Sequence, residues 1–210
     1  YQDASDDWVY VYSTEGVAAH ELLLARAPRE RFDRRHEWEF AAGLGANGAP
    51  RWSKNLDERG PVHRFPEKTT PDTPVPGTVE DWFSWYSWMP SVVYNKPLGV
   101  YIMANHGTYT YSLDEDTYFD QREHTKTGSL MLLWSENPWG PWTEFFYDPY
   151  WHVDDDRNRT YQTTLSQKWI EDDGRTMVLI WSDAGPDKTW RTHTQFYRWN
   201  HMKLRIETEG

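Results

Sequence analysis

Short apolar runs separated by turn residues recur through the second half of the chain. Apolar and aromatic residues fill positions 91–94, 100–103, 130–134 and 143–147, with Gly, Pro or Asn between most of these runs. Runs of four to six aromatic or β-branched residues bounded in this way are typical of strands. We therefore predict one unit of four antiparallel strands over this part of the chain.

The pattern repeats towards the end of the chain. Runs at 165–170, 176–181, 194–198 and 202–206 predict four more strands. When Ser91 is aligned with Ser166, the first two strands of the two units coincide. Repetition of a four-stranded sheet is the signature of a β-propeller blade.

The start of the chain fits three quarters of the same unit. The runs at 8–12, 22–26 and 37–40 match a second, third and fourth strand, and no first strand precedes residue 8. Closed propellers typically have about four to eight blades, and an open stack leaves sheet edges exposed. We therefore predict an all-β fold, a β-propeller of four-stranded antiparallel blades, of which these residues form roughly the last three. The remaining blades would come from an N-terminal portion outside this sequence or from a companion chain.

Within this single propeller domain, three blocks are expected. Residues 1–65 hold the partial blade and the start of a long loop, residues 66–149 the middle blade with an aromatic loop before it, and residues 150–210 the last blade.

The composition excludes several classes of binding partner. A net charge of -11 argues against nucleic acid and against an anionic membrane surface, both of which attract basic proteins. No apolar run approaches the roughly 20 residues of a membrane span. Cysteine is absent, which excludes disulfides and thiolate chemistry but does not fix the compartment. Many of the 14 Trp, 13 Tyr and 8 Phe should pack between blades, and Trp134 is expected to be buried.

The long connections should all lie on one face of the propeller, because the opposite connections are short turns. The long ones are residues 44–89, 106–127, 148–164 and 183–193. Long loops in a compact domain are often functional. The first of them ends in an aromatic segment, in which Trp85, Tyr86 and Trp88 are predicted to line a glycan cleft by stacking on sugar rings. The alternative is a hydrophobic plug between blades.

Polar residues near the strand ends on this face are the candidate site. Asn105 and His106 end a strand near the axis, and Tyr109 follows them. His106 can serve as general acid or base near neutral pH, although a hydrogen-bonded structural histidine is an equal alternative.

Two further groups of polar residues belong to the last unit. Arg159, Tyr161 and Gln162 enter it, and Asp183 ends its second strand at the position that matches Asn105. Arginine binds carboxylates through paired hydrogen bonds, so Arg159 is a candidate for holding an acidic sugar.

We predict no metal cofactor. Asp114, Asp116 and Asp120 offer oxygen ligands suited to a structural calcium ion, but EF-hand spacing is lacking and a solvated acidic loop is the better interpretation.

Several segments together resemble a known group of propeller proteins. They include residues 23–28, 37–43, 90–95, the turn 137–142 with the sequence Asn-Pro-Trp-Gly-Pro-Trp, and residues 173–176. These look like the propellers of polysaccharide-degrading microbes, among them glycoside hydrolases, polysaccharide lyases and propellers with a domain of unknown function. The resemblance spans nearly the whole chain, and its sharpest piece, residues 137–142, is architectural.

The resemblance implies a secreted protein, extracellular or periplasmic, that acts on a polysaccharide or oligosaccharide. Hydrolases of this type would bring acidic side chains to the axis, whereas lyases would use His and Tyr for proton transfer and Arg for a uronate. Asp183 is the one obvious acid here, which favours a lyase that cleaves a uronate-containing polysaccharide by β-elimination, with His106, Tyr161 and Arg159 as catalytic residues. The alternatives are a glycoside hydrolase, a non-catalytic glycan-binding propeller, and a protein-interaction propeller, which would present a flat exposed aromatic patch.

Overall fold

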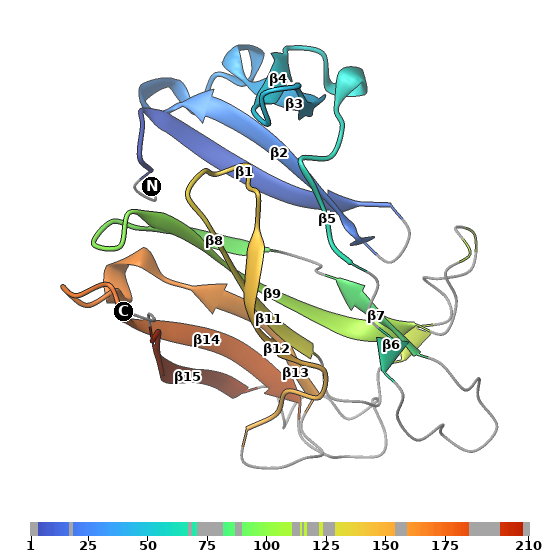
Figure 1. Cartoon of the computed structure of the whole chain (residues 1–210), viewed down its shortest axis with the longest axis vertical. Coiled ribbons are helices and arrows are strands. Elements are labelled where there is room, and N and C mark those ends of the chain that lie inside the picture. Colours follow the sequence, from blue (N-terminus) through green and yellow to red (C-terminus); the bar gives the residue numbers. More distant parts are fainter. Residues whose placement is uncertain are drawn as a thin grey trace.

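The computed structural model shows an all-β protein made of three stacked antiparallel sheets (Figure 1). It describes residues 4–16, 19–66, 69–70, 82–86, 90–110, 114, 116, 122–123, 129–153, 159–184 and 198–207. The predicted fold class is therefore confirmed at the level of all-β with antiparallel sheets.

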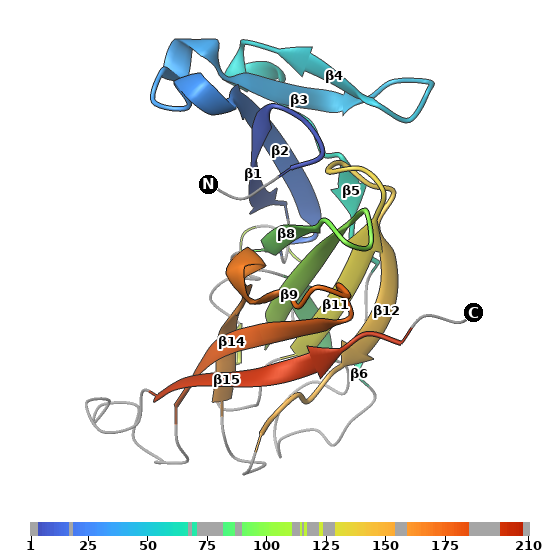
Figure 2. The same ribbon diagram turned by 90° about the vertical axis from the view of Figure 1, so that its left-hand side faces the viewer.

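The first sheet contains five strands in the order β1-β2-β3-β4, with β5 paired to β2. Their bounds are β1 (Trp8–Glu15), β2 (Glu21–Pro28), β3 (Glu39–Leu44), β4 (Pro50–Ser53) and β5 (His63–Arg64). β1 and β2 pair along their whole length, but β2 and β3 pair only at Ala25–Phe40 and Arg26–Glu39. The β3–β4 hairpin consequently turns away from β1 and β2 and crosses the end of the stack (Figure 2).

One arginine holds this hairpin in place. The guanidinium of Arg26 on β2 lies 4.0 Å from the ring centre of Trp8 and 4.0 Å from that of Trp52 on β4. It also forms a 2.6 Å ion pair with Glu39 on β3. Cation–π contacts of this kind contribute about 0.5–2 kcal/mol each, so Arg26 compensates for the short β2–β3 pairing.

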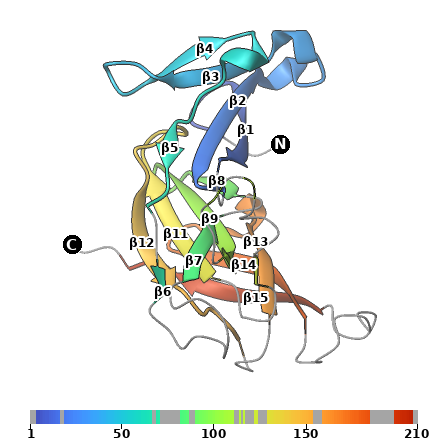
Figure 3. The same cartoon turned by 90° about the vertical axis from the view of Figure 1, so that its right-hand side faces the viewer.

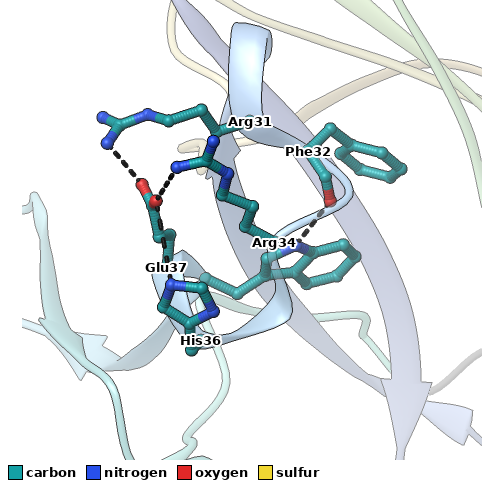
Figure 4. A network of polar contacts seen from close by, with 6 residues as sticks. Arg31, Phe32, Arg34, His36 and Glu37 are labelled. Atoms are coloured by element: carbon teal, nitrogen blue, oxygen red, sulfur yellow. Dashed lines mark hydrogen bonds and ion pairs between the residues drawn. The ribbon is translucent and has the colours of Figure 1, made fainter.

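The connection between β2 and β3 contains two short 3-10 helices, η2 (Arg29–Arg31) and η3 (Arg35–Glu37). Glu37 binds Arg31 at 2.7 Å, and the indole N–H of Trp38 donates to the Phe32 carbonyl at 2.9 Å (Figure 4). Because an exposed ion pair contributes at most about 1 kcal/mol, the packing of Phe32 on Trp38 is the main constraint on this connection.

Residues 44–66 are not the long loop that the sequence predicts. They form β4, the 3-10 helix η4 (Leu56–Glu58) and β5, and the chain is tied to the first sheet through β3 and β2. The prediction was wrong here because β4 and β5 are two to four residues long, too short to give a periodic signal in the sequence.

The central sheet has seven strands in the order β12-β11-β9-β7-β6, with β8 and β10 also paired to β9. Their bounds are β6 (Thr69–Thr70), β7 (Trp82–Tyr86), β8 (Ser91–Asn95), β9 (Val100–Thr110), β10 (Arg122–Glu123), β11 (Ser129–Ser135) and β12 (Thr143–Asp148). The meander β8-β9-β11-β12 is the predicted four-stranded unit. β7 pairs with the second half of β9 and β8 with the first half, so the two strands run in line along one edge of it.

The last sheet has the order β13-β14-β15. Its strands are β13 (Arg159–Leu165), β14 (Thr176–Ala184) and β15 (Arg198–Arg205). The strand predicted at 165–170 is wrong, because β13 ends at Leu165 and the 3-10 helix η5 (Gln167–Trp169) follows. The sequence predicts two strands at 194–198 and 202–206, but a single strand, β15, covers 198–205. Residues 194–197 lie outside the described part.

The central sheet is buried on both faces. Side chains that alternate along β8, β9 and β11 enter two separate cores. The core shared with the first sheet takes Val92, Tyr101, Met103, Met131 and Leu133 from the central sheet. The core shared with the last sheet takes Val93, Ile102, Ala104, Leu130 and Leu132. This explains why β8, β9 and β11 are continuously apolar in sequence, whereas a half-exposed strand would alternate.

Hydrogen bonds join the central and last sheets along one edge. The Leu165 amide donates to Ser91 Oγ at 3.0 Å, and the Gln167 side chain donates to the Tyr94 carbonyl at 3.2 Å. β1, β8 and β13 lie on this side of the stack, and β12 lies on the other (Figures 2 and 3). Trp134 is 39% exposed and not buried as predicted, because it lies near the end of β11, outside the core that Leu130 and Leu132 enter.

At the same edge, the turn after β8 contacts the turn before β14. Asn95 is fully buried at the end of β8, and its side-chain N–H donates to the Gly174 carbonyl at 2.6 Å. Gly174 has a φ of +69°, and a Cβ built on it would lie 2.6 Å from Asn95 Oδ1. Only glycine satisfies both the backbone angle and the close approach.

We expect Gly174→Ala to lower the free energy of unfolding by roughly 2–4 kcal/mol, because it adds a steric clash to the left-handed strain. Gly48→Ala is the matched control, since Gly48 has a φ of +76° but nothing within 4 Å of its Cβ position. Gly48→Ala should lower the free energy of unfolding by only about 1–2 kcal/mol, the cost of the left-handed backbone conformation. Urea denaturation of both variants measures the difference, and equal losses would show that the two turns do not interlock.

Candidate functional site

Buried polar residues gather between the central and last sheets, at the end where the longest connections begin. They are His106 on β9, Thr160 and Thr163 on β13, and Asp183 on β14. Thr160 lies directly opposite Asp183, while the amide of Gln162 contacts His106. The strand positions next to Asp183 and His106 are therefore two residues apart on β13, which places both side chains at the same end of the interface. The structure thus brings together three predicted site residues, His106, Gln162 and Asp183.

His106 is uncharged in this environment. Burial lowers its pKa to about 4, because an imidazolium would lose its hydration between the sheets. The backbone N–H of Gln162 donates to the His106 ring, with its nitrogen 3.2 Å from Nδ1 and 3.4 Å from Nε2. One ring nitrogen of a neutral histidine carries the proton and the other accepts a hydrogen bond. As long as the Gln162 bond is kept, His106 has no free lone pair with which to take a proton.

Gln162 has a strained backbone. Its φ is +56°, and the pairing of β13 with β14 is irregular between Tyr161 and Thr164. A positive φ in a residue other than glycine costs about 1–2 kcal/mol. The bulge directs the Gln162 N–H at His106 and leaves the Gln162 side chain exposed, free to contact a ligand.

Asp183 and Arg198 form the charged part of the site. Asp183 is 2% exposed, and its two carboxylate oxygens each accept from Arg198, from Nε at 3.2 Å and from Nη2 at 3.2 Å. Arg198 lies opposite Asp183 in the β14–β15 pairing, and its side chain is mostly exposed. The pair fixes a guanidinium at the rim, and three of its five N–H groups have no hydrogen-bond partner among the described residues.

Arg198 was missed by sequence reasoning, which placed it in a strand without giving it a role. Its only signal is the cross-strand position opposite an acidic residue, and that register is not visible before the two strands are paired. Thr160 and Thr163 were also missed. Both are polar residues in an otherwise apolar interface, and that interface is not visible before the two sheets are packed.

Asn105 is not part of this cluster. Successive residues of a strand point to opposite faces, and Asn105 is directed towards the first sheet while His106 faces the last sheet. Asn105 is 1% exposed, and within the described part of the chain neither its Nδ2 nor its Oδ1 has a hydrogen-bond partner. The structure therefore separates two residues that are adjacent in sequence and were predicted to act on one substrate.

The other predicted residues are located by their backbone. Arg159 lies opposite Ala184 and Tyr161 opposite Ser182 in the β13–β14 pairing. Trp85 and Tyr86 are on β7, opposite Thr108 and Gly107, so they lie at the same end of β9 as His106. Tyr109 lies opposite Ser84.

The predicted glycan cleft stays a prediction. Trp88 and the greater part of the long connections lie outside the described residues, as does Asp120. The segment 82–86, predicted as part of the long loop 44–89, is a strand in line with β8.

Among the described residues, no three His, Asp or Glu side chains are close enough together to hold a metal ion. Asp114 instead accepts a local hydrogen bond from the Asp116 amide at 2.9 Å. A search of the described ranges likewise finds no helix with the length and apolar character needed to cross a membrane.

One cavity is seen at the opposite, short-turn end of the stack. It has a volume of about 480 Å³ and is lined by Ser5, Asp7, Arg29, Tyr94 and Lys96, among others. Its walls carry charges of both signs, so they do not favour an anionic ligand over a cationic one.

Comparison with known proteins gave no match, neither to a protein-family model nor to a curated protein.

The buried histidine predicts a pH-dependent stability. The pKa of His106 is about 4 in the folded protein and about 6.5 when unfolded, so the unfolded state binds the proton more tightly. The free energy of unfolding should therefore fall as the pH falls from about 6.5 towards 4, by on the order of 3 kcal/mol for this group.

His106→Gln should flatten this dependence while keeping an oxygen acceptor for the Gln162 amide. His63, whose pKa burial also lowers to about 4, remains in both proteins, so the difference in slope belongs to His106. Urea denaturation at several pH values is the measurement, and identical slopes would contradict the assignment.

Proposed function

We propose that this protein is a carbohydrate-active protein of the propeller type that binds a uronate-containing polysaccharide and cleaves it by β-elimination. The observation that carries the proposal is the Asp183–Arg198 pair beside His106 and Gln162. A guanidinium with unused N–H groups, fixed by a buried carboxylate, is suited to binding a second carboxylate through paired hydrogen bonds.

The propeller arrangement is supported by the way the central and last sheets meet. Their first strands, β8 and β13, are joined by hydrogen bonds, and the opposite edge of the stack is formed by β12. In a propeller, neighbouring blades are closest at the strands near the axis, so a contact between the first strands of two sheets supports the proposed arrangement. Further blades, from a portion outside this sequence or from a companion chain, would complete the ring, and a polysaccharide substrate favours an extracellular or periplasmic location.

The residues have defined roles in the proposed elimination. Arg198 would bind the uronate carboxylate and stabilise the negative charge that develops when the adjacent carbon loses its proton. His106, neutral at pH 7, would take that proton once the substrate displaces the Gln162 N–H. The electron pair of the broken C–H bond would form the double bond as the glycosidic C–O bond breaks, and the imidazolium of His106 would give its proton to the departing oxygen. Arg159 and Tyr161, predicted as catalytic residues, lie opposite Ala184 and Ser182, on the other face of the last sheet from Asp183, and take no part in this scheme.

A second function, glycan binding without cleavage, is favoured by one specific observation. The acceptor nitrogen of His106 already receives a backbone hydrogen bond, and burial lowers the pKa of the ring. If substrate binding leaves this bond intact, the site has a cation for the carboxylate but no base.

The proposal is tested by incubating the protein with polygalacturonate, alginate and glucuronate-containing glycans and following the ultraviolet absorbance of the unsaturated product. We expect absorbance to rise with at least one of them and Arg198→Ala to lower the rate by about 100-fold or more, as when one charge-stabilising group is removed. Arg205→Ala is the control, since Arg205 lies on the same strand but at its other end and on the opposite face.

The outcomes separate the candidate functions. If new reducing ends form without a rise in ultraviolet absorbance, the protein is a hydrolase and not a lyase. The protein is a non-catalytic binder if it is retained on an acidic polysaccharide but forms no product. This retention should be unchanged in His106→Ala and lost in Arg198→Ala. A protein that neither binds nor cleaves any of these glycans would overturn the proposal.

A further inference from the structure

The cavity at the short-turn end of the stack has one wall from the first sheet and one from the central sheet. Asp7 precedes β1 and Arg29 begins η2, so both belong to the first sheet and its connections. Tyr94 of β8 and Lys96 of the turn after it form the opposite wall. The volume of about 480 Å³ lies within the range of about 300–1,000 Å³ that is typical of small-molecule sites.

Hydrogen bonds hold the first of these walls in place. The backbone N–H of Arg29 donates to the Asp7 carbonyl at 3.0 Å, and its Nη2 donates to the Asp6 carbonyl at 2.9 Å. The Asp6 carboxylate accepts from the Trp8 amide at 3.1 Å and from the Tyr10 hydroxyl at 2.7 Å. The backbone around Asp7 is therefore fixed by contacts that do not use the Asp7 side chain.

The second wall is connected to the first through a tyrosine of β9. The rings of Tyr94 and Tyr101 lie 4.9 Å apart, and the Tyr101 hydroxyl contacts the Ser5 amide at 3.0 Å and the Ser5 hydroxyl at 2.9 Å. Lys96 is held on its turn by a hydrogen bond from the Gly99 amide to the Lys96 carbonyl at 3.2 Å. The two walls consequently have a defined position relative to one another.

Each wall carries one charge that the chain itself does not pair. Within the described part of the chain, the Asp7 carboxylate and the Lys96 ammonium have no hydrogen bond or ion pair, either with each other or with another residue. Both side chains are exposed, so a ligand can reach them. The charges of the lining cancel, because Asp6 and Asp7 are balanced by Arg29 and Lys96, whereas the whole chain carries -11.

We propose that this cavity binds a small zwitterion, an α-amino acid, with its carboxylate at Lys96 and its ammonium at Asp7. An ammonium donates and a carboxylate accepts, so both contacts are charge-assisted hydrogen bonds. A molecule with a single charge would meet its opposite on one wall and a like charge on the other, which disfavours it. Tyr94 offers an aromatic surface to the side chain of the amino acid. The proposal is separate from the glycan function and does not depend on it.

A titration followed by the amide NMR resonances of the unmodified chain tests whether both charges are recognised. L-phenylalanine and L-alanine carry both charges, N-acetyl-L-phenylalanine carries only the carboxylate, and L-phenylalanine amide carries only the ammonium. We expect at least one free amino acid to shift the resonances of residues 5–7 and 94–96. Each blocked form should have a dissociation constant at least about tenfold higher than free L-phenylalanine, as when one hydrogen bond between charged groups is lost.

Two substitutions assign the ends of the ligand. Lys96→Ala should weaken binding of the free amino acid at least about tenfold and leave the amide unchanged, because the amide has no carboxylate. Asp7→Asn should weaken the free amino acid and leave the N-acetyl form unchanged. Lys168→Ala is the control, since Lys168 is also an exposed lysine but lies on η5, outside the cavity.

Three results would overturn the proposal. The first is the lack of any resonance shift with either amino acid at about 10 mM, a concentration that detects even millimolar dissociation constants. The second is equal affinity for the free and blocked forms, which would show that the two charges are not recognised. The third is an effect of Lys168→Ala as large as that of Lys96→Ala, which would show that only the net charge of the chain matters.

Discussion

The burial of the central sheet on both faces is the constraint on which the rest of the molecule depends. β9 and β11 send alternate side chains into two cores, one with the first sheet and one with the last. Each core consists of roughly ten buried side chains, and burying a Leu or Met contributes about 1.5–3 kcal/mol. Neither outer sheet has an apolar partner of comparable size within the described residues, so both depend on the central sheet for their position.

Packing alone would let two sheets slide over one another, because hydrophobic contacts have little directional preference. Polar contacts at the inner edge remove this freedom. Asn95 reaches across to the carbonyl of Gly174, and Ser91 and Tyr94 accept hydrogen bonds from Leu165 and Gln167. Each bond contributes only about 1 kcal/mol, but each is made at one relative position of the sheets. Within the first sheet, Arg26 of β2 has a comparable role, because two indoles and a carboxylate connect it to three other strands.

The candidate site occupies the end of the interface between the central and last sheets, where apolar residues give way to His106, Thr160, Thr163 and Asp183. The two ionisable groups of the site differ in their surroundings. Asp183 forms an ion pair with Arg198, which lies directly across the strand pair. His106 is held neutral by burial, which lowers its pKa. A cation presented at the rim and a neutral imidazole behind it are the chemical resources available to a ligand there.

The sequence by itself determined the all-β class, the strands β8, β9, β11 and β12, and the end of the sheets at which His106, Gln162 and Asp183 lie. These features follow from apolar runs between turn residues, which are local properties of the chain. It did not determine the start of β13, the strands within residues 44–66, the exposure of Trp134 or the role of Arg198. Residues 159–164 contain three Thr and one Tyr, which favour strands, but they lack the apolar run that marks the other strands. They form β13 because the edge of β14 and side chains of β8 and β9 supply partners for the backbone. Likewise, Asn105 and His106 are neighbours in the chain, but the pleat of β9 and the sheets stacked on either side place them in different cores. Only the tertiary structure could decide this, since it depends on which surface covers each face of a strand.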